Sequence, residues 1–223
     1  MRGGRTTVRV WLSRLVVLLM ALVAAGCAPA TRLAPLPAGT GPPSVVAYGH
    51  SFIGGVSNQG PAWPALLAHD LDRPLIDHGH GGDLVSGCLA RVGSARPVPA
   101  DGDIVVFECD LNDVRRYGAD GRHLRAFERS LRAALGRLRH GRVVVVEDPP
   151  ILAWGRYDPF DHGSTAALGR YNKVIARSLP AGARLVRVVA WDPALMLDQD
   201  GVHPNDAGEA AIVAAVADVL GHR

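Results

Sequence analysis

A serine, a histidine and an aspartate occupy positions from which their side chains could act together. Ser51 follows a short apolar stretch in a turn marked by glycine, and Asp200 precedes His203 by three residues near the end of the chain. A serine hydroxyl is a poor nucleophile at neutral pH, so it needs an imidazole to take its proton and a carboxylate to orient that imidazole. The pattern predicts Ser51 as nucleophile, His203 as general base and Asp200 as the orienting carboxylate.

Attack by such a serine on a carbonyl carbon produces a negatively charged oxygen, which needs hydrogen-bond donors. Three donors are candidates: the backbone N–H of Ser51, the backbone N–H of Gly82 and the side-chain amide of Asn112. Gly82 ends a glycine-rich turn, where backbone N–H groups can approach a ligand closely. We therefore expect these groups to form an oxyanion hole, in which loss of one donor typically costs about 3–4 kcal/mol of transition-state stabilisation.

The Asp-x-x-His spacing does not identify a catalytic pair by itself, because it occurs at Asp77/His80, Asp120/His123 and Asp200/His203. Only the last pair follows the fifth predicted strand and precedes a proline that suits the first turn of a helix. Asp120 is instead typical of a helix N-cap. Position along the chain, and not spacing, selects Asp200 and His203.

Short β-branched stretches alternate with longer helical stretches over the region that carries these residues. The expected strands are 45–48, 73–77, 103–109, 142–147 and 185–189, and the expected helices are 62–71, 83–92, 121–139, 165–179 and 204–220. Strict alternation predicts right-handed βαβ units and a five-stranded parallel sheet covered on both faces. In such folds ligands bind beyond the carboxyl ends of the strands, where each candidate residue falls.

In order and across nearly the whole of this region, these motifs resemble the blocks of the SGNH or GDSL-like hydrolases, a family of serine esterases and lipases. The resemblance rests on Gly-x-Ser, a Gly before Asp, an Asn-Asp pair and Asp-x-x-His-Pro. It implies a flavodoxin-like three-layer α/β/α sandwich and the roles given above for Ser51, Gly82, Asn112, Asp200 and His203. It also implies cleavage of carboxylic esters through an acyl-serine intermediate, with no metal or organic cofactor.

Two positions depart from the family pattern. His50 stands where the family usually has Asp, and Asp110 stands where it usually has Gly. Both neighbour proposed catalytic residues, so a second hypothesis is a non-catalytic, ligand-binding envelope lipoprotein on the same scaffold. An α/β-hydrolase is the nearest structural competitor, but Ser51 lacks the Gly-x-Ser-x-Gly context of that fold.

The histidine pair His78 and His80, followed by Asp83, raises the question of a metal site. The spacing differs from that of metallo-β-lactamase-like enzymes, which place the Asp two residues after the second His. We therefore expect no metal, one imidazole at the rim of the active site and the other in solvent.

The first 26 residues have the pattern of a signal peptide, which predicts export. A basic stretch ends at Arg14, and the apolar stretch 15–25 would rise only about 16 Å as a helix, against about 30 Å of a bilayer core. Ala24-Ala25-Gly26-Cys27 resembles the bacterial lipobox, so Cys27 is the predicted lipidation site and membrane anchor. Without that lipid the protein would be secreted. Residues 27–44 are rich in Pro and Gly and predict a tether, leaving 45–223 as the hydrolase domain.

Charge does not indicate a nucleic-acid partner. The formal net charge of +3 includes four arginines of the signal segment, so residues 27–223 carry −1. The other two cysteines, Cys88 and Cys109, form either a disulfide or two buried free thiols.

The substrate class is the most open prediction. Acetyl groups on carbohydrate and short lipid or aryl esters both fit the motifs. The aromatic-containing loop 148–163 is either a substrate-facing wall or an ordinary packed loop.

Overall fold

The computed structural model describes residues 43–55, 60–138 and 140–222 of the chain. The predicted signal segment 1–26, the predicted lipidation site Cys27 and most of the predicted tether 27–44 lie outside these residues. Within the described part, no helix is both long and apolar enough to cross a membrane.

Five parallel strands form the single described sheet, in the order β2-β1-β3-β4-β5. They are β1 (Val45–Gly49), β2 (Leu75–Gly79), β3 (Ile104–Glu108), β4 (Arg142–Val146) and β5 (Arg184–Val186). Every residue of β1 and β3 is buried, as expected of strands covered on both faces. The predicted flavodoxin-like α/β fold is confirmed.

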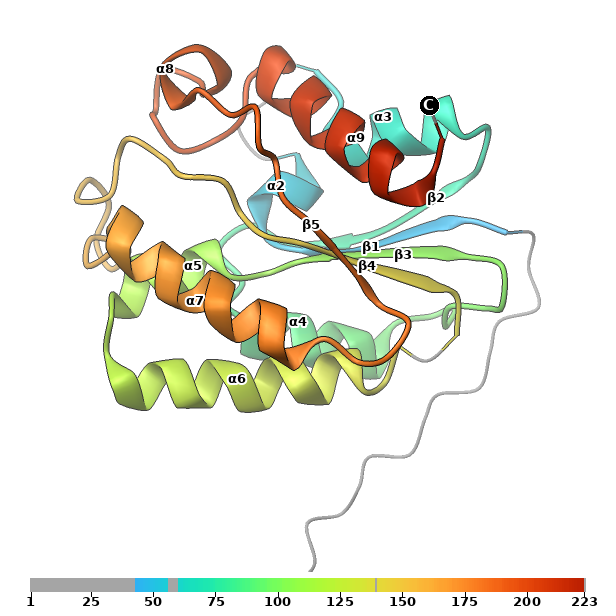
Figure 1. Ribbon diagram of the computed structural model, residues 1–223, viewed down its shortest axis with the longest axis horizontal. Coiled ribbons are helices and arrows are strands. Elements are labelled where there is room, and N and C mark those ends of the chain that lie inside the picture. Colours follow the sequence, from blue (N-terminus) through green and yellow to red (C-terminus); the bar gives the residue numbers. More distant parts are fainter. Residues whose placement is uncertain (1–42, 56–59, 139, 223) are drawn as a thin grey trace, which may run out of the picture. The chain divides into compact units, whose positions relative to one another are not determined.

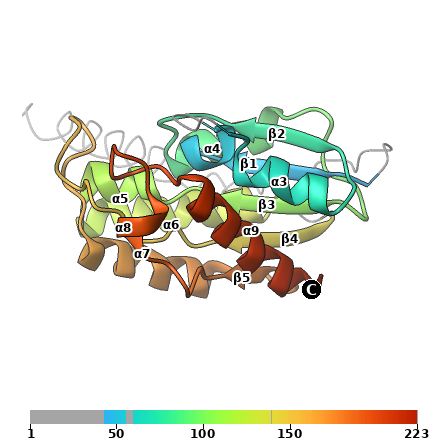
Figure 2. The ribbon, with the colours of Figure 1, turned by 90° about the horizontal axis from the view of Figure 1, so that it is seen from above.

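Helices cover both faces of the sheet (Figure 1). One face carries α3 (Trp63–Asp70) and α9 (Asp206–Leu220), which lie over the strands in the view from above (Figure 2). The other face carries α4 (Val85–Ser94), α6 (Gly121–Leu135) and α7 (Thr165–Ser178). Side chains alternate along each strand, so neighbouring residues enter different cores: Val46 packs on the α4/α6/α7 side and Val45 on the α3/α9 side.

Most element boundaries differ from the sequence-based expectation by one to four residues, and two of these differences have a clear physical reason. The second strand was expected at 73–77 but lies at 75–79, because β1 continues to Gly49 and pairs there with Gly79. The last helix was expected to begin at Pro204 but begins at Asp206, because the Asn205 side chain caps it by accepting hydrogen bonds from the N–H groups of Ala207 and Gly208.

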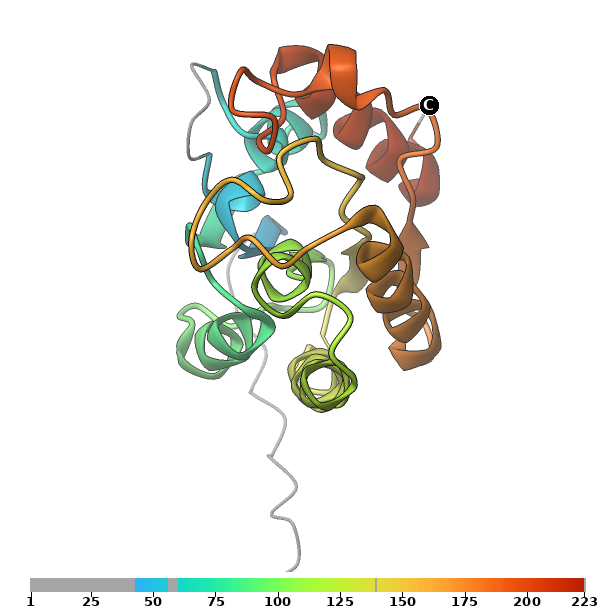
Figure 3. The same ribbon diagram turned by 90° about the vertical axis from the view of Figure 1, so that its left-hand side faces the viewer.

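Three short helices were not predicted: α2 (Ser51–Gly54), α5 (Leu111–Tyr117) and α8 (Pro193–Met196). Each has at most 7 residues, too few for a helical hydrophobic period to show in the sequence. Helices α2 and α5 begin where β1 and β3 end, so they occupy the carboxyl edge of the sheet, the edge that Figure 3 faces. This edge also receives the loop after β4 and the segment around α8.

Candidate active site

The nucleophile candidate starts a tight turn at the end of β1. Ser51 is the first residue of α2, and the His50 carbonyl accepts hydrogen bonds from the N–H groups of Ile53 (3.2 Å) and Gly54 (3.1 Å). Gly49 precedes this turn, and a Cβ there would collide with the Ile53 side chain and the Glu108 carbonyl. The glycine thus lets the chain turn closely enough to place Ser51 at the sheet edge.

A continuous hydrogen-bonded relay joins Ser51 to His203 and Asp200. His203 Nε2 lies 2.9 Å from Ser51 Oγ, and His203 Nδ1 lies 2.5 Å from Asp200 Oδ2. The second oxygen of Asp200 accepts the N–H groups of Val202 (2.8 Å) and His203 (3.0 Å). Burial by itself would raise the pKa of Asp200, but these hydrogen bonds and the imidazole outweigh it and lower that pKa. Asp200 is therefore ionised and holds the imidazole with Nε2 facing the serine.

The loop that carries Asp200 and His203 is held from both sides. Within the loop, the Asp198 N–H donates to the His203 carbonyl at 2.8 Å and the Gly201 N–H donates to the Asp198 carbonyl at 2.9 Å. Gly201 adopts φ +69°, a conformation that favours glycine. Its carbonyl accepts the N–H groups of Leu152 and Ala153, both at 2.9 Å, so the catalytic loop rests on the loop after β4.

The two further oxyanion candidates lie on neighbouring segments that the structure ties together. The Asn112 side-chain amide donates to the Asp83 carbonyl at 3.0 Å, directly beside Gly82. An amide carries two N–H donors, so one stays available for a ligand. Gly82 is exposed with φ +81°, and a Cβ built on it has no atom within 4 Å. Its backbone is therefore accessible to a substrate.

Asp113, the second residue of the Asn-Asp pair, anchors the helix α4, which precedes it in the chain. Its Oδ2 accepts the Val85 N–H at 2.7 Å, at the start of α4. Burial raises the pKa of Asp113 to about 7, even though the Val85 hydrogen bond and the neighbouring His50 and Arg116 act to lower it.

The histidines that raised the question of a metal have other partners. His78 stacks on Tyr48 of β1 with ring centroids 4.9 Å apart, and His80 Nδ1 lies 3.2 Å from Asp83 Oδ1. Asp83 also accepts the Arg91 Nε–H at 2.6 Å. Among the residues that the structure describes, no group of three or more His, Cys, Asp or Glu side chains could hold a metal ion.

A disulfide joins Cys88 of α4 to Cys109 at the end of β3, with Cα atoms 6.7 Å apart. Of the two alternatives left open by the sequence, the structure contains the bonded pair. The bond connects the segments that precede Asn112 and follow Gly82, so it restrains both oxyanion candidates.

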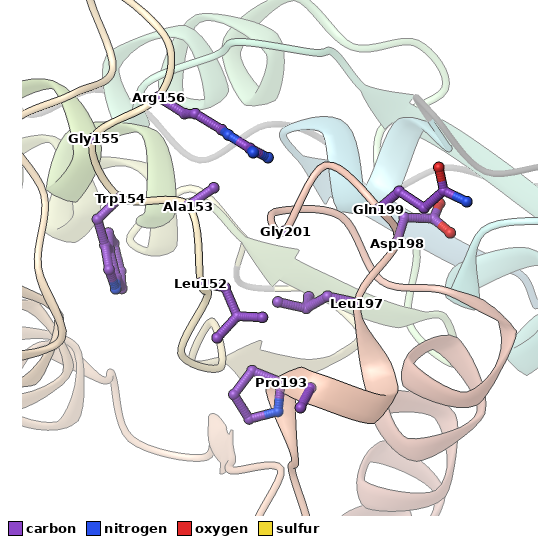
Figure 4. Close-up of a pocket in the computed structure, with 11 residues that line it drawn as sticks. Leu152, Ala153, Trp154, Gly155, Arg156, Pro193, Leu197, Asp198, Gln199 and Gly201 are labelled. Carbon is purple, nitrogen blue, oxygen red and sulfur yellow. The ribbon is translucent and has the colours of Figure 1, made fainter.

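A cavity of 690 Å³ lies beside the catalytic loop (Figure 4). Its walls come from the loop after β4 and the segment around α8, and Leu152 points toward Leu197 and Pro193. Polar side chains are also present, among them Arg156, Asp198 and Gln199. The aromatic rings of Tyr157 and Phe160 do not line this cavity; the guanidinium carbon of Arg115 lies 5.7 and 5.4 Å from their centroids.

A further buried residue at this edge is Asp148, to which the sequence assigned no role. It lies two residues beyond the end of β4 at Val146, and its fully buried side chain contacts His50. Its place after a strand of four valines, at the same edge as the other site residues, is the signal that could have identified it.

Known proteins resemble this chain in sequence pattern and in fold. Residues 38–211 match the model of the GDSL-like lipase/acylhydrolase family. No curated protein sequence matches. Among solved structures, a lipase/acylhydrolase from Enterococcus faecalis is 16% identical, with a TM-score of 0.63 over 79% of this chain and 94% of that one. A catalytic mutant of Axe2, an acetylxylan esterase from Geobacillus stearothermophilus, is 16% identical, with a TM-score of 0.63 over 85% and 98%. The psychrotrophic esterase EstA from Pseudoalteromonas sp. is 17% identical, with a TM-score of 0.61 over 80% and 96%.

Proposed function

Because the chain belongs to the GDSL-like lipase/acylhydrolase family, whose members are carboxylic ester hydrolases, we propose that it cleaves carboxylic esters through an acyl-serine intermediate. The observation that carries this proposal is the 2.9 Å contact between His203 Nε2 and Ser51 Oγ. It supplies a base within hydrogen-bond reach of the nucleophile, which acyl transfer requires.

In the first half of the reaction, Ser51 Oγ attacks the ester carbonyl carbon while His203 Nε2 takes the hydroxyl proton. The carbonyl oxygen becomes an oxyanion, which the N–H groups of Ser51 and Gly82 and the Asn112 amide stabilise. The intermediate collapses when the alcohol leaves, and His203 returns the proton to its oxygen. Ser51 is left as an acyl ester.

In the second half, a water molecule attacks the acyl carbon and His203 takes its proton. Collapse of the second intermediate breaks the bond to Ser51 Oγ, which regains a proton from His203. The carboxylic acid is released. Asp200 stays ionised throughout and stabilises the imidazolium that forms in both halves.

A small acyl group on a carbohydrate alcohol is the substrate that we propose. The cavity beside the catalytic loop combines the apolar side chains of Leu152 and Leu197 with polar groups from Arg156, Asp198 and Gln199, a mixture that suits sugar surfaces. The structural similarity to the acetylxylan esterase Axe2 supports the same substrate class.

We also propose, from the sequence, that the enzyme is exported and tethered to the membrane by lipid on Cys27. Replacement of the thiol should release it, so a Cys27→Ser variant is expected in the soluble extracytoplasmic fraction and the wild type in the membrane fraction. Equal distribution of the two proteins would contradict the anchor.

A fluorophosphonate probe and p-nitrophenyl acetate test the catalytic proposal directly. The wild type should label at Ser51 and turn over the ester, whereas Ser51→Ala should do neither and His203→Ala should not label. If the wild type neither labels nor hydrolyses the ester, the non-catalytic binding hypothesis replaces this one.

A further inference from the structure

Beneath the nucleophile lies a fully buried pair of side chains, His50 and Asp148. Both side chains have no exposed surface. His50 Nε2 lies 3.1 Å from Asp148 Oδ1 and 3.0 Å from Asp148 Oδ2, so one N–H faces both carboxylate oxygens. The two residues come from the ends of β1 and β4, on either side of β3.

The hydrogen bonds of His50 determine where its proton sits. His50 is the N-cap of α2, and its Nδ1 accepts the Phe52 N–H at 3.3 Å. Acceptance requires an unprotonated Nδ1, so the proton is on Nε2 and points at Asp148. The imidazole thus accepts a hydrogen bond in the first turn of α2, where Ser51 lies, and donates one to Asp148 through its other nitrogen.

Asp148 in turn holds the start of α5. Its Oδ2 accepts the N–H groups of Leu111 (2.9 Å) and Asp110 (3.4 Å). The next residue is Asn112, which supplies the candidate oxyanion amide. One imidazole and one carboxylate therefore connect the helix that begins with the nucleophile to the helix that carries the oxyanion donor.

His50 and the hydrogen-bond donors around Asp148 keep the negative charge on this carboxylate. Burial raises the pKa values of Asp110 and Glu108 well above their ordinary values, and the nearby Asp148 charge raises both further. Burial would raise the pKa of Asp148 too, but His50 and the donors around it lower that pKa to about 2. The Asp148 N–H also donates to Asp110 Oδ1 at 3.4 Å. The raised pKa of Asp110 favours its neutral form, which adds no second charge beside Asp148.

We propose that His50 and Asp148 are positioning residues, which set the distance and orientation between the Ser51 hydroxyl and the Asn112 amide. This inference rests on the proposed ester hydrolysis. It gives a joint reason for the two departures from the family pattern: with Asp110 and Asp148 packed together, an Asp at position 50 would add a further buried carboxyl, whereas His50 supplies a donor.

Variants separate the two contacts of His50. His50→Asn keeps a side-chain acceptor near the Nδ1 position for the Phe52 N–H but does not reach Asp148 as the imidazole does. Asp148→Asn keeps an acceptor for the Leu111 N–H and removes the charge. His50→Asp keeps the cap and sets two carboxylates against each other. The double variant, His50→Asp with Asp148→Asn, leaves a single carboxylate at this place and so removes the repulsion between the two.

Steady-state hydrolysis of p-nitrophenyl acetate, with thermal unfolding of each purified protein, tests the proposal. We expect His50→Asn and Asp148→Asn to lower kcat about 10- to 100-fold with little change in KM, as is typical of residues that orient reacting groups. His50→Asp should lose more activity, and the double variant should recover at least about tenfold over it.

Asp103→Asn is the matched control. Asp103 is a buried carboxylate at the opposite, amino edge of the sheet, where it accepts the N–H groups of Ser44 (2.7 Å) and Ala100 (2.6 Å). The Asp103→Asn variant should be less stable than the wild type but should keep the wild-type kcat, measured well below the unfolding temperature of the variant.

The outcomes distinguish this inference from the proposed function. If His50→Asn and Asp148→Asn unfold earlier but keep the wild-type kcat, as Asp103→Asn should, the pair is only structural and the inference is overturned. A double variant that folds without recovering activity also overturns it. If the wild type hydrolyses no ester, the proposed function fails and this inference fails with it. If His50→Asp does not fold, the kcat and the unfolding temperature of His50→Asn and Asp148→Asn are sufficient to test the inference.

Discussion

His203 Nε2 lies 2.9 Å from Ser51 Oγ although the two residues are 152 positions apart in the chain. The parallel sheet explains this contact. β1 delivers Ser51 to the carboxyl edge, and the segment after β5 brings His203 to the same edge before α9 leads the chain away. The base and the nucleophile thus meet without any further element being needed to join them.

Replacing the orienting carboxylate should impair the base while leaving substrate binding intact. We expect Asp200→Asn to lower kcat by several orders of magnitude, toward the roughly 10⁴-fold loss typical of an amide in this position, because the wrong imidazole tautomer is favoured. Steady-state kinetics with p-nitrophenyl acetate measures the change. Asp120→Asn is the matched control, since Asp120 has the same spacing to His123 and a 2.9 Å contact with its Nδ1 on an exposed surface. A comparable loss in both variants would contradict the assignment of Asp200.

Removal of the Asn112 amide should weaken stabilisation of the oxyanion. Asn112→Ala should lower kcat on the order of 10²- to 10³-fold, with a smaller change in KM, because the amide acts mainly in the transition state. The variant should still take up a fluorophosphonate probe, more slowly than the wild type. Asn172→Ala, in α7, removes an amide that is not a candidate oxyanion donor and should keep the wild-type rate. Full activity in Asn112→Ala would remove the amide from the oxyanion hole.

The raised pKa of Asp113 predicts a stability that depends on pH. Its pKa of about 7 in the folded protein exceeds the ordinary value of 3.8, so the folded state binds the proton more tightly than the unfolded state. This group therefore destabilises the fold progressively as pH rises from about 4 to about 7. Asp113→Asn should raise the free energy of unfolding more at pH 8 than at pH 5, measured by urea denaturation. An equal change at both pH values would contradict the prediction.

Breaking the disulfide should lower stability, because the loop between the two cysteines then gains conformational entropy in the unfolded chain. Cys88 and Cys109 are 21 residues apart, and closure of such a loop typically contributes about 3 kcal/mol. The Cys88→Ser and Cys109→Ser variants should each lose about this much in urea denaturation, and reductant should destabilise the wild type but neither variant. If non-reduced protein alkylates at both thiols, no bond is present and the prediction fails.

The cavity beside the catalytic loop should contribute more to the binding of esters with a large alcohol group than to the binding of esters with a small one. Arg156→Ala and Gln199→Ala remove polar groups from its wall. Each should raise KM for an acetylated xylo-oligosaccharide by about 5- to 10-fold, the loss typical of one hydrogen bond, and change KM for p-nitrophenyl acetate much less. Arg125→Ala on α6 is the control. Equal effects on the two esters would show that the cavity does not bind the sugar.

Predictions from the sequence were correct where contacts between residues close in the chain determine the structure. Asp120 caps α6 as predicted, since its carboxylate accepts the N–H groups of Arg122 and His123 within three residues. The continuously apolar strands and their alternation with helices were sufficient to predict a parallel sheet. Strands covered by helices on both faces are buried on both sides, so their sequences are apolar without interruption. Boundaries were less certain where a distant strand or a cap set them, as at Gly79 and Asp206.

The pairing of His50 with Asp148 could not be read from the sequence. The residues are 98 positions apart, and nothing local to either one indicates the other. His50 by itself looks like a departure from a family motif, and Asp148 looks like the first residue of a loop. Only the packing of β1, β3 and β4 makes them one buried unit.

The amino-acid sequence by itself determined the order of the strands and helices along the chain and the kinds of side chain that follow each strand, because these depend on near neighbours and on hydrophobic periodicity. Position along the chain had already selected Asp200 and His203, but the tertiary structure decided how closely His203 approaches Ser51 and which carboxylate contacts His50. Those contacts form only when the sheet brings distant strand ends to one edge. Burial there excludes water, which strengthens each hydrogen bond.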